Sequence, residues 1–263
     1  ARVHLLHVTT LEEMNYIGPF KDNVSVEVTP QHLTFHAEVH EVRQTDEGVE
    51  IVYLDKQLGE MGTVSADYCI STIPLPVFLQ LPQKDVANET LEAMRNGPYF
   101  PVGKMGMQFK RRFWEEDDWI YGGLTLTNIP EIGTISYPTW DYHSPKGVLQ
   151  AYYNFGNTAL KVSSLSPQER IELALELGSK IHPQYREEFE AGFSVNWHLQ
   201  PYALGGWSSW SSNAREQYYP RLLEPDGRIY LSGDFLGYVP GWMEGAIQAS
   251  WLQIGKLHQR VVQ

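Results

Sequence analysis

The residues with the clearest capacity to bind a ligand lie near the C-terminal end of the sequence. The segment Gly227–Asp234 reads as a short buried strand that ends in a Gly-Asp step, and Gly241–Ala246 leads into a helix. The first N–H groups of a helix have no partner within it and carry partial positive charge, so small residues at this helix start would let an anionic group approach. Asp234 could bind a hydroxyl group of a ribose or another polyol. The same spacing equally fits an ordinary strand–loop–helix connection.

Other common reaction types lack their residues. The sequence has no G-x-S-x-G motif, and its single cysteine, Cys69, lies in an apolar run, which excludes an intrachain disulfide and a cysteine-based metal site. His32, His36 and His40 recur every fourth residue, a spacing that would stack three imidazoles on a helix. The apolar alternation across Leu33–Val42 favours a strand instead, where the three rings are too far apart to chelate. We therefore predict no metal site.

Composition limits the partners. The net charge of −12 and the pI near 5.2 argue against a nucleic-acid backbone as a ligand. No apolar stretch approaches the roughly 18 residues that a transmembrane helix needs, so a soluble protein, cytoplasmic or secreted, is expected. G-x-G occurs nowhere in the 263 residues, so neither the Rossmann fingerprint nor a Walker A loop is present in them.

Short strands separated by Gly and Pro turns dominate the sequence up to about residue 160. Turns are expected at Gly48 and around Gly59 and Gly62, and Pro74 ends one strand. The predicted strands are Leu33–Arg43, Val49–Leu54, Ala66–Ile73, Lys104–Phe109, Ile120–Leu126, Gly133–Tyr137, Leu149–Asn154 and Arg228–Leu231. The close spacing of the first strands predicts a β-meander attached to a larger sheet.

Two helices carry clear signals. Ser166 and Glu169 form a capping box around Pro167, which starts a helix that is expected to run to Ile181. A longer helix, roughly Met243–Val262, closes the chain. Its predicted apolar side consists of Ile247, Trp251, Ile254, Leu257 and Val261. Strands and helices together predict a mixed class, α+β or α/β.

The C-terminal residues resemble a known family. GRIYLSGD, followed after a gap by GWMEGAIQA, is similar to the closing motif of the flavin-containing amine oxidases, which include monoamine oxidases and L-amino-acid oxidases. Ala66–Pro74 resembles the family's strand before the substrate domain, and Lys104 stands ten residues before Trp114, like the family's flavin-side lysine. RFWEEDDWIYGG (Arg112–Gly123) and YALGGW (Tyr202–Trp207) resemble the L-amino-acid oxidase branch.

The resemblance implies that the protein binds FAD. Asp234 would face its ribityl or pyrophosphate region, and the amides around Met243 would approach the flavin N1/O2 edge, where helix-start donors stabilise negative charge. Trp207 stands where some members carry a flavin-linked cysteine, so FAD is expected to be noncovalent. The residues that the resemblance places against the cofactor are Val39, Trp197, Trp207, Gly233, Asp234, Gly241, Trp242, Met243 and Ala246.

The resemblance also implies a substrate site. Lys104 would hold a water against flavin N5, and Trp242 would form one wall of a cage that steers the amine. Tyr152, or Tyr153 one residue on, would contact the substrate carboxylate. Taken singly, Lys104 fits a surface lysine and Trp242 a core residue; their joint order supports the functional reading. The implied catalytic residues are Lys104, Tyr152 and Trp242, and the implied substrate-binding residues are Tyr152, Tyr153, Ser208, Gly241 and Trp242.

By this resemblance, an FAD-binding domain would be interleaved with a mixed-sheet substrate domain. Residues 1–97 and 196–263 would form the FAD side, and residues 98–195 the substrate side. The implied reaction passes hydride from an L-amino acid to flavin N5 and ends in a 2-oxo acid, ammonia and hydrogen peroxide, with oxygen as acceptor. An amine oxidase or an amino-acid 2-monooxygenase of the same fold, and a non-catalytic flavin-binding subunit, are the alternatives.

The family's opening βαβ unit, with its G-x-G-x-x-G loop, is absent from this sequence. A dinucleotide site without that loop would lose most of its pyrophosphate contacts. We therefore expect a second polypeptide to supply this unit, as in a hetero-oligomer made by proteolytic processing, and the Ala1 start agrees with that expectation. A homo-oligomer of the assembled unit is also expected.

Overall fold

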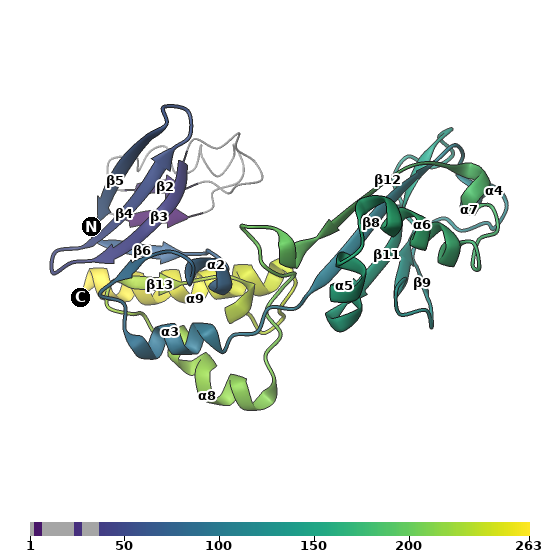
Figure 1. The fold of residues 1–263 in the computed structure, drawn as a ribbon. Coiled ribbons are helices and arrows are strands. Elements are labelled where there is room, and N and C mark those ends of the chain that lie inside the picture. Colours follow the sequence, from purple (N-terminus) through teal and green to yellow (C-terminus); the bar gives the residue numbers. More distant parts are fainter. Residues whose placement is uncertain (1–2, 7–23, 28–36) are drawn as a thin grey trace. The chain divides into compact units, whose positions relative to one another are not determined.

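The structure, a computed structural model, describes residues 3–6, 24–27 and 37–263. The chain divides into two compact units (Figure 1): unit 1 is Ala1–Tyr99 with Pro201–Gln263, and unit 2 is Phe100–Gln200. The division falls a few residues beyond the boundaries expected from the sequence. Which unit binds cofactor and which binds substrate remains a prediction.

Unit 1 contains two four-stranded sheets. The first is parallel, with the order β13-β6-β1-β2. Its strands are β1 (Val3–Leu6), β2 (Val24–Glu27), β6 (Tyr68–Ser71) and β13 (Ile229–Leu231). The second has the order β5-β4-β3-β7 and is antiparallel except where β7 joins β3. Its strands are β3 (Ala37–Gln44), β4 (Val49–Asp55), β5 (Glu60–Ala66) and β7 (Gln83–Lys84).

One hydrophobic core joins these sheets to the helices of unit 1. The helices are α2 (Leu75–Phe78), α3 (Asn88–Arg95), α8 (Ser212–Leu223), the short 3-10 helix η3 (Asp234–Leu236) and α9 (Met243–Val262). Cys69, Ile229 and Leu231 of the parallel sheet are buried together with Phe235 of η3 and Ala249 of α9. The end of β13, the helix η3 and the helix α9 therefore share one core, and this shared packing positions the Gly-Asp step between β13 and η3.

Unit 2 is built on an antiparallel sheet with the order β12-β8-β11-β10-β9. Its strands are β8 (Val102–Phe109), β9 (Leu124–Leu126), β10 (Thr134–Ser136), β11 (Gly147–Phe155) and β12 (Phe189–Asn196). Its helices are α4 (Phe113–Glu116), α5 (Gly156–Ser163), α6 (Pro167–Gly178), α7 (Tyr185–Glu188) and the 3-10 helix η2 (Trp197–Leu199). Helices α5 and α6 pack on β8, β11 and β12 (Figure 1), over a core that includes Met105, Met107 and Leu175.

The mixed fold class and the capping box of Ser166 with Glu169 are confirmed, but several predicted boundaries are wrong. Gly62 lies inside β5 opposite Tyr53, so the turn is made at Gly59, whose φ is +69°. The strand predicted over Ala66–Ile73 is interrupted at Asp67 and continues only as β6. Of the strand predicted over 120–126, only β9 forms, because positive φ at Gly122 and Gly123 breaks the extended backbone before it. The helix predicted over 166–181 ends at Gly178. The elements β12, α3 and α8 were not predicted. Residues 33–36, together with His32, lie outside the described ranges.

Of the apolar side predicted for helix α9, only Leu257 is buried, and the other buried residues lie on a different side. Its buried residues are Gly245, Ala249, Gln253 and Leu257, whereas Trp251 is 73% exposed and Ile247 and Ile254 are also exposed. Small side chains at 245 and 249 let the helix approach η3 closely, and large ones at those positions would not fit. Within the described ranges, no helix combines the length and apolar character that crossing a bilayer requires.

Candidate functional site

The predicted site residues gather in two clusters, one in each unit. The cluster of unit 2 is centred on Lys104 in β8. Tyr153 of β11 and Val195 of β12 lie directly beside it on the two neighbouring strands. Cross-strand partners project to the same face of a sheet, and alternate residues project to opposite faces. Because Met105 is buried under the helices, Lys104, Tyr153 and Val195 belong to the other face, named here the open face.

One aromatic ring lies against the lysine, and two further rings continue from it. The Lys104 Nζ lies 4.2 Å from the centroid of the Tyr153 ring, a cation–π distance. The Tyr153 ring lies 4.4 Å from that of Phe155, which stacks on Phe100 at 6.2 Å. Burial lowers the pKa of Lys104, and no described carboxylate counteracts the shift. An amine in such surroundings exchanges a proton more readily than a solvated lysine does.

The structure separates the two adjacent tyrosines. The pairing of β11 with β8 shifts register between Gln150 and Tyr152, which places Tyr152 opposite Met105. The Tyr152 side chain is 1% exposed and belongs to the core of unit 2, and burial raises its pKa. Tyr153 therefore shares the face of Lys104, and Tyr152 does not.

Trp197 extends this cluster along the edge of the sheet. It begins η2 directly after β12, two residues beyond Val195, and is half-buried. The sequence-based domain boundary put Trp197 on the FAD side, but it belongs to the same compact unit as Lys104.

The cluster of unit 1 forms around the carboxylate of Asp234. The backbone N–H of Gly241 donates to Asp234 Oδ2 at 3.1 Å, and the N–H groups of Ser208 and Phe235 also donate to this carboxylate. Burial raises the pKa of Asp234, and these donors act against the rise. Gly233, Asp234, Ser208 and Gly241 are thus brought together.

Only glycine fits at position 241. Its φ is +79°, and a Cβ there would lie 3.1 Å from Cγ of Trp207. Such a Cβ would be both strained in the backbone and crowded by the indole. The indole of Trp207 therefore packs directly against the backbone that leads into α9.

The start of α9 is open to a ligand. Trp242 is its N-cap and provides no side-chain cap, while Trp242 and Met243 are 67% and 85% exposed. Gly245 lets the helix cross the preceding loop, because a Cβ there would lie 2.2 Å from the carbonyl oxygen of Val239. Uncapped N–H groups in the first turn, with half-buried Ala246 beside them, suit an anionic or electron-rich group.

Tyr99 joins the Asp234 cluster, although sequence reasoning missed it. Tyr99 forms an antiparallel bridge with Ser208, and both burial and the negative charge of Asp234 raise its pKa. Its only sequence signal is an aromatic pair between Pro98 and Pro101. Val39 lies in β3 and packs on the core of unit 1. That core also contains Phe235, the residue after Asp234, and no described contact joins Val39 to Asp234 itself.

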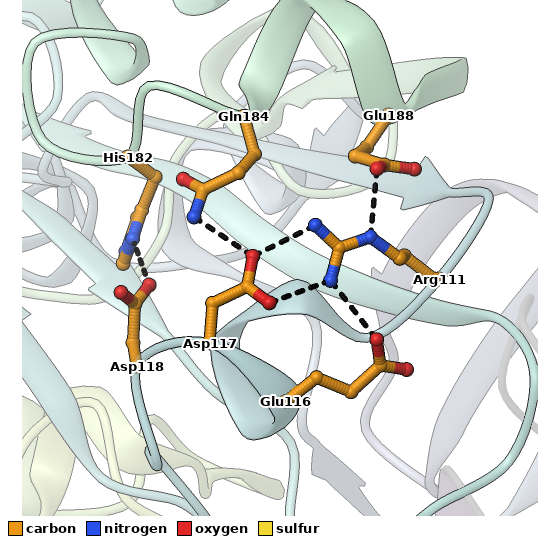
Figure 2. Close-up of polar contacts among 7 residues, drawn as sticks. All are labelled: Arg111, Glu116, Asp117, Asp118, His182, Gln184 and Glu188. Atoms are coloured by element: carbon orange, nitrogen blue, oxygen red, sulfur yellow. Dashed lines mark hydrogen bonds and ion pairs between the residues drawn. The ribbon is translucent and has the colours of Figure 1, made fainter.

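The charged motif after β8 makes a structural network (Figure 2). Arg111 pairs with Glu116 at 2.9 Å, Asp117 at 2.7 Å and Glu188 at 2.7 Å. Gln184 also donates to Asp117 at 3.0 Å, and Arg111 lowers the pKa of this carboxyl to about 2. These charges hold α4 and α7 together at one end of unit 2.

The chain matches the family model described as flavin containing amine oxidoreductase over residues 22–253. It belongs to that family. The family resemblance seen in the closing motif is therefore confirmed, and the family is one of amine oxidoreductases. A Bacillus subtilis (strain 168) protein provisionally named L-amino-acid oxidase YobN is 30% identical over 83% of this chain and 46% of that protein. An L-amino-acid oxidase of Siganus canaliculatus is 28% identical over 83% of this chain and 42% of its own length.

Solved amine oxidase structures share the fold of this family member. A triple mutant of putrescine oxidase superposes with a TM-score of 0.75 and 16% identity, over 94% of this chain and 52% of that one. Cyclohexylamine oxidase from Brevibacterium oxydans IH-35A superposes with a TM-score of 0.71 and 17% identity, over 95% of this chain and 52% of that one. The chain thus spans under half the length of the curated relatives named above and about half of these structures.

Proposed function

We propose that this family member contributes the substrate side and part of the flavin side of an L-amino-acid oxidase. The reaction converts an L-amino acid, oxygen and water into a 2-oxo acid, ammonia and hydrogen peroxide. The observation that carries the proposal is Lys104, a half-buried lysine that faces Tyr153 on the open face with no described acidic partner. L-amino-acid oxidases at 26–30% identity support the substrate class.

The residues of unit 1 fit a flavin. The uncapped start of α9 offers backbone donors, and the exposed Trp242 beside it offers an aromatic wall. Asp234 supplies a carboxylate whose neighbours Gly233 and Gly241 carry no side chain that could block a ligand. By the family resemblance, Trp207 stands where some members carry a flavin-linked cysteine, so we propose noncovalent FAD. When bound, the flavin would accept a hydride, and with it two electrons, from the C–H bond next to the amine.

The chain's own residues would bind and orient the substrate. Lys104 would hold a water molecule and exchange its proton, because burial keeps its pKa below that of a solvated lysine. Tyr153 would place its hydroxyl toward the substrate carboxylate from the same face of the sheet. Trp242 would restrict the path of the amine by its indole surface. Each of these roles is positional, and none of them requires a strong base in the protein.

The Gly-rich loop that would bind the FAD pyrophosphate is not found in these 263 residues, because G-x-G does not occur in them. We propose that a second polypeptide carries this loop. Native mass spectrometry of the purified protein tests the arrangement: a flavin-containing particle with a second chain supports it. A monomer of this chain alone that retains FAD contradicts it.

An anaerobic visible spectrum tests the reaction. The complete protein is mixed with L-leucine, L-phenylalanine or putrescine under argon. Bleaching of the flavin band by the amino acids, but not by putrescine, supports amino-acid oxidation. Bleaching by putrescine alone assigns a simple amine oxidase, and a flavin that stays oxidised with all three contradicts the proposed substrates.

A further inference from the structure

Unit 2 carries a cavity away from the open face. Its volume is about 260 Å³, and it lies between the start of α6, strand β12 and η2. Arg170, Ile171, Ser194, Asn196, Leu199 and Gln200 line it. Ser194 and Asn196 pair with Met105 and Gly103 of β8, so they project to the helix-covered side of the sheet, whereas Val195 between them pairs with Lys104. The polar residues that β12 contributes to the cavity therefore lie on the side of the strand opposite to the open face.

Arg170 is held in place by neutral groups only. Its Nε donates to the carbonyl of Leu165 at 3.0 Å, and its Nη1 donates to Ser194 Oγ at 2.8 Å. Throughout the part of the chain that the structure describes, no carboxylate forms an ion pair with this guanidinium. Guanidinium groups on a pocket wall usually meet a carboxylate or phosphate, which their planar fork fits in a bidentate manner.

The rest of the wall combines polar and apolar groups. Asn196 is 4% exposed, and its Oδ1 has no hydrogen-bond partner among the described residues. A buried amide oxygen without a partner is costly, and as an acceptor it could receive an N–H or O–H group of a ligand rather than its carboxylate. Ile171 and Leu199 add an aliphatic surface, and Gln200 adds a second amide.

We propose that this cavity binds a small organic carboxylate, with Arg170 receiving the carboxylate and Ile171 and Leu199 packing on its apolar body. The volume lies just below the roughly 300–1,000 Å³ of typical small-molecule sites, which limits the ligand to a compact one. A free amino acid, a 2-oxo acid and a simple aryl acid share this chemistry. Ser194 and Asn196 of the cavity lie on the side of β12 opposite to Val195 and Lys104, and the inference does not depend on the proposed oxidation.

Isothermal titration calorimetry of the purified protein tests the site with phenylacetate as the probe and phenylacetamide as its uncharged counterpart. Phenylacetate is expected to bind at least about tenfold more tightly than the amide, because charge-assisted bonds are stronger than neutral ones. Arg170→Gln is expected to weaken phenylacetate binding by about 10- to 100-fold, since it removes the charge and the fork. Leu199→Trp fills the rim without touching Arg170 and is expected to abolish binding.

Two controls keep the result unambiguous. Arg186→Gln removes an exposed guanidinium that pairs with Glu172 at 3.1 Å on the same unit, and it should leave binding unchanged. Lys104→Met removes the cation of the open face and should also leave binding unchanged. Equal binding of the amide, or unchanged binding in Arg170→Gln, overturns the proposal. So does loss of binding in Lys104→Met alone, because that result assigns the carboxylate to the open face.

Discussion

Lys104 and Tyr153 pair directly across β8 and β11, and the lysine Nζ lies 4.2 Å from the centroid of the tyrosine ring. The pair occupies the face of the sheet that α5 and α6 leave uncovered, while Tyr152, one residue earlier, is buried beneath them. Burial lowers the pKa of this lysine, and no described carboxylate opposes the shift, so its amine is available to a ligand. The pair is therefore the natural first target for mutation.

Lys104→Met should reduce kcat of the complete enzyme by at least about tenfold, a factor typical of a group that moves or holds a proton. The free energy of unfolding should change by less than about 1 kcal/mol, because loss of the cation–π contact is offset by relief of the desolvation cost. Stopped-flow flavin kinetics and urea unfolding measure the two effects. Lys110→Met, at the exposed residue that directly follows β8, should leave kcat unchanged. Normal turnover in Lys104→Met would remove the lysine from the mechanism.

The two tyrosines should respond in opposite ways to truncation. Tyr152→Ala removes a fully buried ring from the core and should cost about 3–5 kcal/mol of unfolding free energy. Tyr153→Ala should cost far less stability and instead raise KM for the amino acid, because it removes a side chain of the open face. Urea unfolding of both variants measures the loss of stability, and steady-state kinetics measures the change in KM. A larger KM effect in folded Tyr152→Phe than in Tyr153→Phe would favour Tyr152 as the substrate contact.

The strand pattern placed Lys104 in a strand, and the family resemblance named Tyr152 first as the substrate contact, with Tyr153 as the alternative. Period-two alternation assigns faces correctly only while the register is regular, and the shift between Gln150 and Tyr152 makes Ala151 and Tyr152 both face the core. A bulge of this kind depends on pairing with β8, which is far away in the sequence. The prediction that Lys104 and its neighbours form a strand needed only local information, and it is confirmed by β8.

The closing helix shows the same limit. Its extent was predicted well, from Met243 to Val262, but its buried side was not. The sequence offers two stripes, one of large apolar residues around Trp251 and one formed by Gly245, Ala249 and Gln253. Hydrophobicity favours the first stripe, whereas close packing on η3 selects the second. The Arg170 cavity could not be predicted either, because it joins α6 to β12, a strand that the sequence pattern did not reveal.

The stability of unit 2 should fall as the solution becomes acidic through the ordinary range of histidine. His182 is buried, its Nδ1 lies 2.8 Å from Asp118 Oδ2, and its Nε2 lies 2.6 Å from the Tyr137 hydroxyl (Figure 2 shows the Asp118 contact). Burial lowers the pKa of His182, and Asp118 only partly opposes the shift. The unfolded chain therefore binds a proton more readily than the folded one, so this stability is complete above about pH 6.5 and is lost as pH falls toward the folded pKa.

His182→Gln should flatten that pH dependence. The variant should be less stable than the wild type at pH 7.5, because both hydrogen bonds are disturbed, and the difference should shrink between pH 6.5 and 5. Thermal unfolding across this range measures both curves. His143→Gln, at an exposed histidine of the same unit, is the matched control and should keep the wild-type slope. An unchanged slope in His182→Gln would show that other groups govern the acid response.

Gly241→Ala tests whether the cluster around Asp234 holds the cofactor. The added Cβ would sit 3.1 Å from Trp207 and would disturb the backbone whose N–H donates to Asp234. Gly59→Ala is the matched control, because Gly59 also has a left-handed φ, +69°, but has nothing within 4 Å of an added Cβ. Both variants should lose about 1 kcal/mol of stability from backbone strain. Only Gly241→Ala should also lose flavin, measured as the ratio of flavin to protein absorbance after gel filtration. Equal flavin content in the two folded variants would place the cofactor elsewhere.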